Sequence, residues 1–248
     1  MAGVTLDVRE RVAIVTIENR EVRNGLTPEM CGQLLAVCDE IDEDETVGAA
    51  VVRGADGTFC SGADTRLWTA DLDWAGEGFE LVSRIYDGFA RVGRLAVPTV
   101  AAVRGAAVGA GMNLLFACDL RLLADDARLR AGFAKVGLHP GGGFFTLANR
   151  LVGREVTAAL GLFDVGLKGE EAVACGLALE TVPDEQVEPR AFELASVPAR
   201  DPSLARRTVR SMRQELGPPA IGWEAAIEME RGSQLWSMRR RFKDETNC

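Results

Sequence analysis

The stretch that decides the fold is Pro98-Thr-Val-Ala-Ala-Val-Arg-Gly-Ala-Ala-Val-Gly-Ala-Gly-Met-Asn-Leu-Leu-Phe-Ala-Cys-Asp119. Its β-branched and alanine run predicts a buried strand, and Arg104-Gly105 predicts a turn. Gly109-Ala-Gly111 then lets the backbone bend tightly into a helix that runs through Ala117. A strand that breaks on small residues and opens a helix presents free N–H groups and the positive end of the helix dipole. This arrangement suits a developing negative oxygen, but close packing of helix on strand explains the small residues equally well.

A second stretch of the same construction favours the first interpretation. Residues 54–64 read Gly-Ala-Asp-Gly-Thr-Phe-Cys-Ser-Gly-Ala-Asp, follow a β run at 49–53 and end in small residues before a helical segment. Together these segments resemble the crotonase family, also called the enoyl-CoA hydratase/isomerase family. The matching pieces keep the family's order and spacing over nearly the whole chain: Arg53-Gly54, Phe59–Asp64, Pro98–Asp119 and Gly137–Gly143.

The resemblance implies an α/β (α+β) fold in two parts. Residues 1–185 would form the family's ββα spiral core, which binds acyl-CoA, and residues 186–248 a C-terminal helical oligomerisation region. The sequence pattern agrees coarsely, since strands with crossing helices give way to helical periodicity alone. The resemblance further implies a homotrimer or a dimer of trimers. Candidate contacts in the tail are Ile221, Trp223, Met229, Leu235 and Trp236.

Composition excludes several classes of function. The 248 residues carry a formal charge of −9, which argues against a nucleic-acid or anionic-membrane binder. The N-terminus lacks a signal-peptide pattern and no run approaches the ~20 apolar residues of a membrane helix, so we expect a cytoplasmic protein. The 6 cysteines form no C-x-x-C pair and His139 is the only histidine, so no metal site is expected. We expect no cofactor apart from the CoA that the substrate carries.

The family resemblance assigns the two oxyanion donors. It implies that the thioester oxygen of an acyl-CoA meets the backbone N–H groups of Ala63 and Ala110, with Gly62 and Gly109 beside them. Preorganised donors of this kind are worth about 3–4 kcal/mol each. Ala110 stands where many members have glycine, which a backbone donor tolerates at negative φ.

Four further residues are candidates for contacts with CoA or for shaping its site. By motif position, Arg66 would contact the nucleotide phosphates and Arg23 the pantetheine entrance. For each arginine the alternative is a solvated surface charge. Asp64 is expected to cap the following helix. Trp68, beside the small-residue loop, is equally a core residue and a wall of the ligand pocket.

Two departures from the family pattern concern the reaction. A hydratase of this family uses two glutamates to hold one water, and their positions are filled here by Asn113 and by Phe133, seven residues before Pro140. Positioned acid–base groups contribute roughly 10²–10⁴ in rate, and neither residue accepts a proton. We therefore expect an enzyme that acts on a CoA thioester through an enolate, by isomerisation, decarboxylation or thioester cleavage. The alternative is a non-catalytic acyl-CoA binding protein.

The Pro-Gly-rich turn supplies the last candidates. Pro140 and Gly141 are expected to line the substrate site. His139 is a candidate general base, because imidazole titrates near neutral pH. In relatives this position is apolar and packs inward, so a buried structural histidine is the favoured interpretation. The tail arginines at 206, 207, 210 and 213 are expected on solvated helix faces or at subunit contacts.

Overall fold

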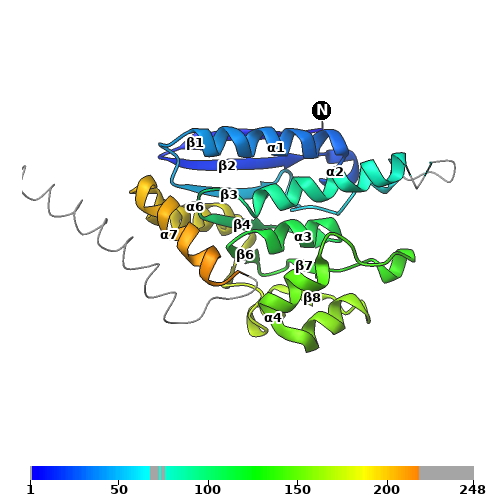
Figure 1. Ribbon diagram of the computed structural model, residues 1–248. Coiled ribbons are helices and arrows are strands. Elements are labelled where there is room, and N and C mark those ends of the chain that lie inside the picture. Colours follow the sequence, from blue (N-terminus) through cyan, green and yellow to red (C-terminus); the bar gives the residue numbers. More distant parts are fainter. Residues whose placement is uncertain (1, 68–72, 74–75, 218–248) are drawn as a thin grey trace, which may run out of the picture.

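A six-stranded sheet carries the fold, and its strands step down from β1 at the top of Figure 1. The computed structural model describes residues 2–67, 73 and 76–217. The strand order is β1-β2-β3-β4-β6-β9, with the first pair antiparallel and the others parallel. The bounds are β1 Gly3–Arg9, β2 Val12–Glu18, β3 Ala49–Gly54, β4 Thr99–Val103, β6 Leu120–Ala124 and β9 Glu180–Val182.

Strands β1 and β2 form an N-terminal hairpin with a two-residue turn. Glu10 and Arg11 have φ of 48° and 68°, the left-handed conformation that matches a tight turn to the twist of the strands. A smaller sheet of order β5-β7-β8 lies beyond β6. Its strands are β5 Ala106–Val108, β7 Arg128–Arg130 and β8 Leu167–Lys168.

Helices cover the main sheet on both sides. Helix α2 packs between α1 and α3, whereas α6 crosses β2, β3, β4 and β6. Thr27 caps α1, since its Oγ1 accepts from the Met30 N–H at 3.2 Å. The helices are α1 Pro28–Glu43, α2 Glu77–Val92, α3 Ala110–Ala117, α4 Phe144–Gly161, α5 Gly169–Ala174, α6 Val187–Ala199 and α7 Pro202–Glu215. Short 3-10 segments are η1 Arg20–Val22, η2 Thr65–Leu67, η3 Ala134–Val136 and η4 Asp184–Gln186.

The central stretch folds as predicted, with one addition. Strand β4 is buried along its whole length, and Gly105 turns the chain with φ +59°. The next three residues form β5, which pairs with β7, before Gly109 opens α3. Close packing explains the small residue at Gly111, where an added Cβ would lie 2.3 Å from the carbonyl oxygen of Cys60.

Four thiols lie within the apolar core. Burial raises the pKa of Cys31, Cys38, Cys60 and Cys118 to about 12. Cys175 is partly exposed and also free. No helix among the described residues is long and apolar enough to cross a membrane.

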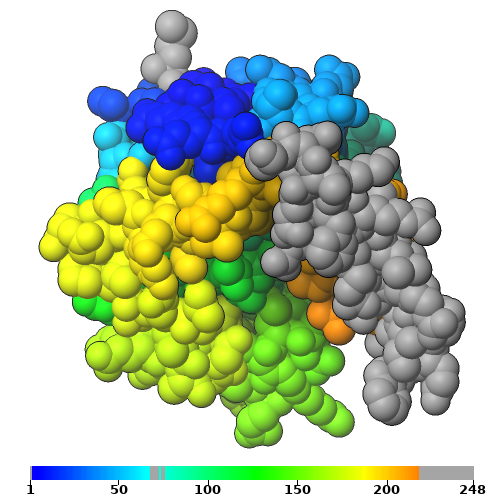
Figure 2. Space-filling view, turned by 90° about the vertical axis from the view of Figure 1, so that its left-hand side faces the viewer, coloured from blue at the N-terminus to red at the C-terminus, as the bar shows by residue number. Residues whose placement is uncertain are grey.

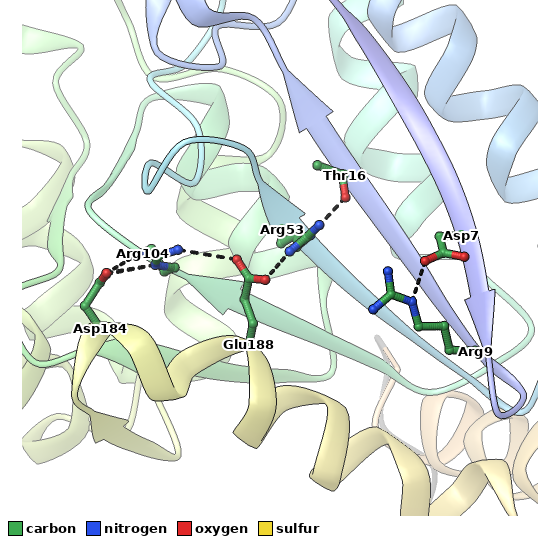
Figure 3. A network of polar contacts seen from close by, with 7 residues as sticks. All are labelled: Asp7, Arg9, Thr16, Arg53, Arg104, Asp184 and Glu188. Carbon is green, nitrogen blue, oxygen red and sulfur yellow. Dashed lines mark hydrogen bonds and ion pairs between the residues drawn. The ribbon is translucent and has the colours of Figure 1, made fainter.

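An ion-pair network fixes α6 to the ends of two strands (Figure 3). Glu188 lies between Arg53 at the end of β3 and Arg104 just after β4. Arg104 also donates its Nε to both carboxylate oxygens of Asp184, each at 3.0 Å. Arg104 Nη2 donates to Asp184 as well, and this bidentate contact fixes η4, which leads into α6, relative to β4.

The tail helices dock on the core, which corrects the expectation of solvated arginines at two positions. Arg206 donates to the main-chain oxygens of Ile41, Asp42, Asp44 and Val47 at 2.7–3.2 Å, and so caps the end of α1. Arg213 pairs with Asp119 and also donates to the main chain before β4. The expectation failed because these acceptors lie far away in the sequence.

The docked tail also reaches the hairpin. Arg11 donates to the carbonyl oxygen of Arg200 at 3.1 Å, and Figure 2 shows the yellow tail segment lying against the blue N-terminal strands. The part of the expected oligomerisation region from residue 218 onward, with all of its candidate subunit contacts, lies outside the described residues.

Candidate active site

A cavity of about 280 Å³ opens between α2, the loop 61–65, the start of α3 and the segment 131–141. Its wall is mostly apolar, with Val82, Ile85 and Phe89 on α2 facing Val136 and Leu138. No Asp or Glu among the described residues lines it. The polar side chains that do so are Ser61, Thr65, Tyr86, Asn113 and His139.

The backbone of Ala63 faces the start of α3. Leu26 bonds to both neighbours of Ala63, donating to the Gly62 carbonyl and accepting from the Asp64 N–H, each at 2.8 Å. The N–H of Ala63 therefore points to the other side of this bridge. The start of α3 lies close to this loop, since a Cβ added to Gly62 would stand 3.0 Å from the Val108 oxygen and 3.7 Å from the Ala110 nitrogen.

The N–H of Ala110 is the first of helix α3. Gly109 precedes it with φ 53° and ψ −119°, a conformation open in practice only to glycine. Later N–H groups of this turn, those of Met112 and Asn113, bond back to the Gly109 carbonyl. Within the described chain, neither the Ala63 nor the Ala110 N–H has a hydrogen-bond acceptor. Two free donors thus lie on adjoining segments at the cavity.

The side chain of Asn113 is hydrogen-bonded to the glycine-rich turn. The side chain is 1% exposed, and its Nδ2 donates to the carbonyl oxygens of Gly141 and Gly142 at 3.0 and 2.9 Å. Since carbonyl oxygens only accept, these bonds fix which side of the amide is nitrogen. Its Oδ1 is buried without a partner in the described structure, which leaves an acceptor on the cavity wall.

The turn lies too close to α2 for larger residues. A Cβ on Gly141 would be 2.0 Å from the Tyr86 hydroxyl oxygen, and one on Gly142 would be 2.4 Å from Phe89 Cζ. Gly142 also has φ +65°. The close approach explains the glycines and places the Tyr86 hydroxyl beside the Gly141 backbone.

Phe133 fills space, as its chemistry predicts. It lines the cavity and packs edge-on against Phe144, with ring centroids 5.4 Å apart. An edge-to-face pair of this kind stabilises the apolar wall.

The prediction of a buried His139 was wrong. The side chain is exposed and lines the cavity, with its ring 6.2 Å from that of Phe145. Its Nδ1 lies 2.6 Å from the carbonyl oxygen of Pro140, the next residue. This local bond turns the ring along the loop instead of into the core.

Asp64 and Arg66 form a tight pair. Asp64 accepts from the Arg66 backbone N–H at 3.1 Å, at the start of η2, and from its guanidinium at 2.7 Å. The guanidinium of Arg66 holds the pKa of Asp64 below its usual range. Arg66 also donates to Glu21 at 3.0 Å. Its guanidinium is therefore already shared between two carboxylates.

A second hollow, of about 370 Å³, lies next to the cavity and shares Ser61 and Val108 with it. Arg23 and Arg128 both line it. The sequence reasoning identified Arg23 but not Arg128, which stands in a three-residue strand without a motif. Trp68, the remaining candidate, lies outside the described residues. The described part of the chain holds no group of three His, Cys, Asp or Glu residues that would suit a metal.

Comparison with known proteins decides the family. A family model described as enoyl-CoA hydratase/isomerase matches residues 7–221. The chain belongs to this family. The family resemblance of the sequence and the α/β fold expected from it are thereby confirmed, the fold also by the solved structures.

Individual members of the enoyl-CoA hydratase/isomerase family match over most of their length. "Probable enoyl-CoA hydratase EchA14" of Mycobacterium tuberculosis is 40% identical over 240 residues, 95% of this chain and 92% of its own. The "1,2-epoxyphenylacetyl-CoA isomerase" of Escherichia coli is 31% identical, over 82% of this chain and 79% of its own. A crystal structure of a putative enoyl-CoA hydratase from Thermobifida fusca in complex with CoA superposes with TM-score 0.83 at 27% identity, covering 98% of this chain and 95% of that one.

Proposed function

We propose that the cavity binds the acyl part of an acyl-CoA thioester and stabilises an enolate of it. The observation that carries this proposal is the pair of acceptor-free N–H groups, of Ala63 and Ala110, on adjoining segments at an apolar cavity. Negative charge that develops on a thioester oxygen between two such donors is stabilised without reorganisation. The names of the relatives, several of which refer to CoA, support a thioester of CoA as the ligand.

The second hollow is the proposed place for the CoA part. It continues from the cavity across Ser61 and Val108, so a ligand that fills both is elongated. Arg23 and Arg128 supply two cationic groups there against one carboxylate, that of Asp126, and guanidinium groups bind phosphates well. Arg66 is the weaker candidate for a phosphate contact, because two carboxylates already bind its guanidinium.

The reaction we propose is one other than hydration by two carboxylates. Among the described residues the cavity wall holds no carboxylate, and the two family positions hold an amide and a phenyl ring. The wild-type protein should therefore hydrate crotonyl-CoA barely above background. A turnover near the ~10 s⁻¹ typical of enzymes would contradict this.

The test of the oxyanion site removes one N–H without adding a polar group. Ala110→Pro lacks the N–H and suits the first position of a helix, whereas Ala110→Gly keeps the N–H. The infrared carbonyl band of a carbon-13-labelled acyl-CoA should shift to lower frequency on binding the wild type and Ala110→Gly, and shift less on Ala110→Pro. An equal shift in all three would refute the site. Absence of binding, by calorimetry at millimolar acyl-CoA, would refute the whole proposal.

We also propose that the protein is cytoplasmic, needs no cofactor beyond its substrate's CoA, and assembles as a homotrimer or dimer of trimers through residues 186–248. Obligate interfaces are large and apolar, so the assembly should persist at micromolar concentration. Sedimentation that shows a monomer there would contradict the assembly.

A further inference from the structure

One turn of the chain orients Asn113 and His139, the two nitrogen-bearing side chains that line the cavity in the described part of the chain. Three consecutive carbonyl groups, those of Pro140, Gly141 and Gly142, face these side chains. The first lies against His139 Nδ1 and the other two accept from the Asn113 amide. The turn therefore sets which atoms of these two side chains remain available to a ligand.

The contact with Pro140 decides where His139 carries its proton. A carbonyl oxygen only accepts, so the Nδ1 that lies 2.6 Å from it must be the donor. A neutral imidazole has one N–H, and its other nitrogen then bears a free lone pair. In neutral His139 this nitrogen is Nε2. The backbone thus keeps the ring in the tautomer that accepts a proton at Nε2.

Few other groups near His139 could accept a proton. The segments packed around it bring the phenyl ring of Phe145 from α4 and the phenol of Tyr86 from α2. Lys135 on η3 is exposed and does not line the cavity. Among the described residues of the cavity wall, Tyr86 and His139 are the only titratable ones. The Asn113 amide is not a base.

We propose that His139 removes a proton from the carbon next to the thioester of the bound acyl-CoA. Its Nε2 takes the proton, and the C–H electron pair forms the carbon–carbon double bond of the enolate. The carbonyl π pair moves to the oxygen between the Ala63 and Ala110 N–H groups. Return of the proton from Nε2 reverses the step, so no other reactant is needed. This inference rests on the function proposed above.

The step is measurable without knowing the overall reaction. In D₂O, a base that removes and returns this proton exchanges it for deuterium, and mass spectrometry of butyryl-CoA counts the exchanged positions. We expect wild-type enzyme to catalyse the exchange. Binding without any exchange would overturn the role of His139 alone, whereas absence of butyryl-CoA binding would overturn the proposed function as well.

Two variants separate proton transfer from a merely structural role. His139→Asn places an amide Nδ2 where Nδ1 lies, so the bond to Pro140 survives but the proton acceptor is lost. We expect exchange to fall at least ~100-fold in this variant, the lower end of acid–base contributions, while butyryl-CoA still raises the melting temperature. Lys135→Gln removes the charge of an exposed side chain on η3 that does not line the cavity, and it should keep exchange within a few-fold of wild type. Exchange that survives in His139→Asn, or that falls equally in Lys135→Gln, would overturn the assignment.

The pH profile gives an independent readout. A protonated imidazole accepts no proton, so exchange by the wild type should decrease on acidification. The residual exchange in His139→Asn should lack this decrease. A decrease that is equal in both proteins would point to another group and overturn the proposal.

Discussion

Replacing Asn113 by Asp should destabilise the protein strongly, although the two side chains are almost the same size. The Asn113 amide donates two hydrogen bonds, at 2.9 and 3.0 Å, to carbonyl oxygens of the glycine turn, and it is 1% exposed. A carboxylate in its place would face those oxygens with no proton to share. The variant must therefore bury a charge beside two acceptors or protonate its new carboxyl group.

The loss of stability follows from the second alternative, protonation of the carboxyl group, which costs less free energy than burying a charge. Holding a carboxyl group with an unfolded pKa of about 3.9 in its protonated form at pH 7 costs about 4 kcal/mol. A protonated carboxyl donates only one hydrogen bond, so one buried carbonyl loses its partner for a further ~1–3 kcal/mol. The total is about 5 kcal/mol or more, which corresponds to a fall in melting temperature of roughly 10–20 °C in a chain of this size.

The dependence on pH has a definite sign. The folded variant binds a proton that the unfolded chain releases above about pH 4, so its stability falls as the pH rises. Melting curves at pH 7 and pH 5 should show a larger loss at pH 7. Asn149→Asp makes the same chemical change at an exposed position of α4 and should cost less than ~0.5 kcal/mol. An Asn113→Asp protein as stable as this control at pH 7 would refute the reasoning.

Three further predictions concern other contacts. Arg206→Ala should cost about 2–3 kcal/mol in urea unfolding, because four carbonyl groups at the end of α1 and in the loop after it lose a charged donor. Arg206→Lys should recover part of this loss, and equal stability of wild type and Arg206→Ala would contradict the prediction. Gly142→Ala should destabilise the protein far more than Gly143→Ala. Both glycines have positive φ, but only a Cβ at 142 would clash with a neighbour, the ring of Phe89. Similar melting temperatures of the two variants would exclude the clash. Arg66→Gln should raise the pKa of Asp64 in an NMR titration. In the wild type, the stability that this pair contributes should be lost as the pH falls through the lowered pKa of Asp64. An unchanged titration of Asp64 in the variant would rule out the pairing.

The sequence predicted those parts of the fold that have local patterns. A run of β-branched residues and alanines located β4, and small residues located the passage from β4 to α3. Helix α2 brings Val82, Ile85, Tyr86 and Phe89 to one wall of the cavity. Which residues lie opposite them depends on how the segment 131–141 returns to α2, for which the sequence has no local pattern.

The candidate site was less predictable where a single contact decides the outcome. The exposure of His139 depends on one bond to the next carbonyl group in a turn without periodicity. The role of Asn113 depends on two glycines 28 and 29 residues further along the chain. The family resemblance assigned Asn113 and Phe133 to the positions of the two glutamates, but it did not predict that the amide at 113 binds the turn.

The buried thiols make the folded protein a reporter of its own unfolding. A thiolate is the species that reacts with alkylating reagents, and burial that raises the pKa of Cys31, Cys38, Cys60 and Cys118 to about 12 suppresses it. Each thiol also lies where reagent does not reach while the core is closed. A pulse of iodoacetamide followed by peptide mass spectrometry would thus time the opening of four sites, on α1, on the loop after β3 and beyond α3. Labelling of all four at one rate would mean that the core opens as a single unit, and separate rates would show which layer opens first.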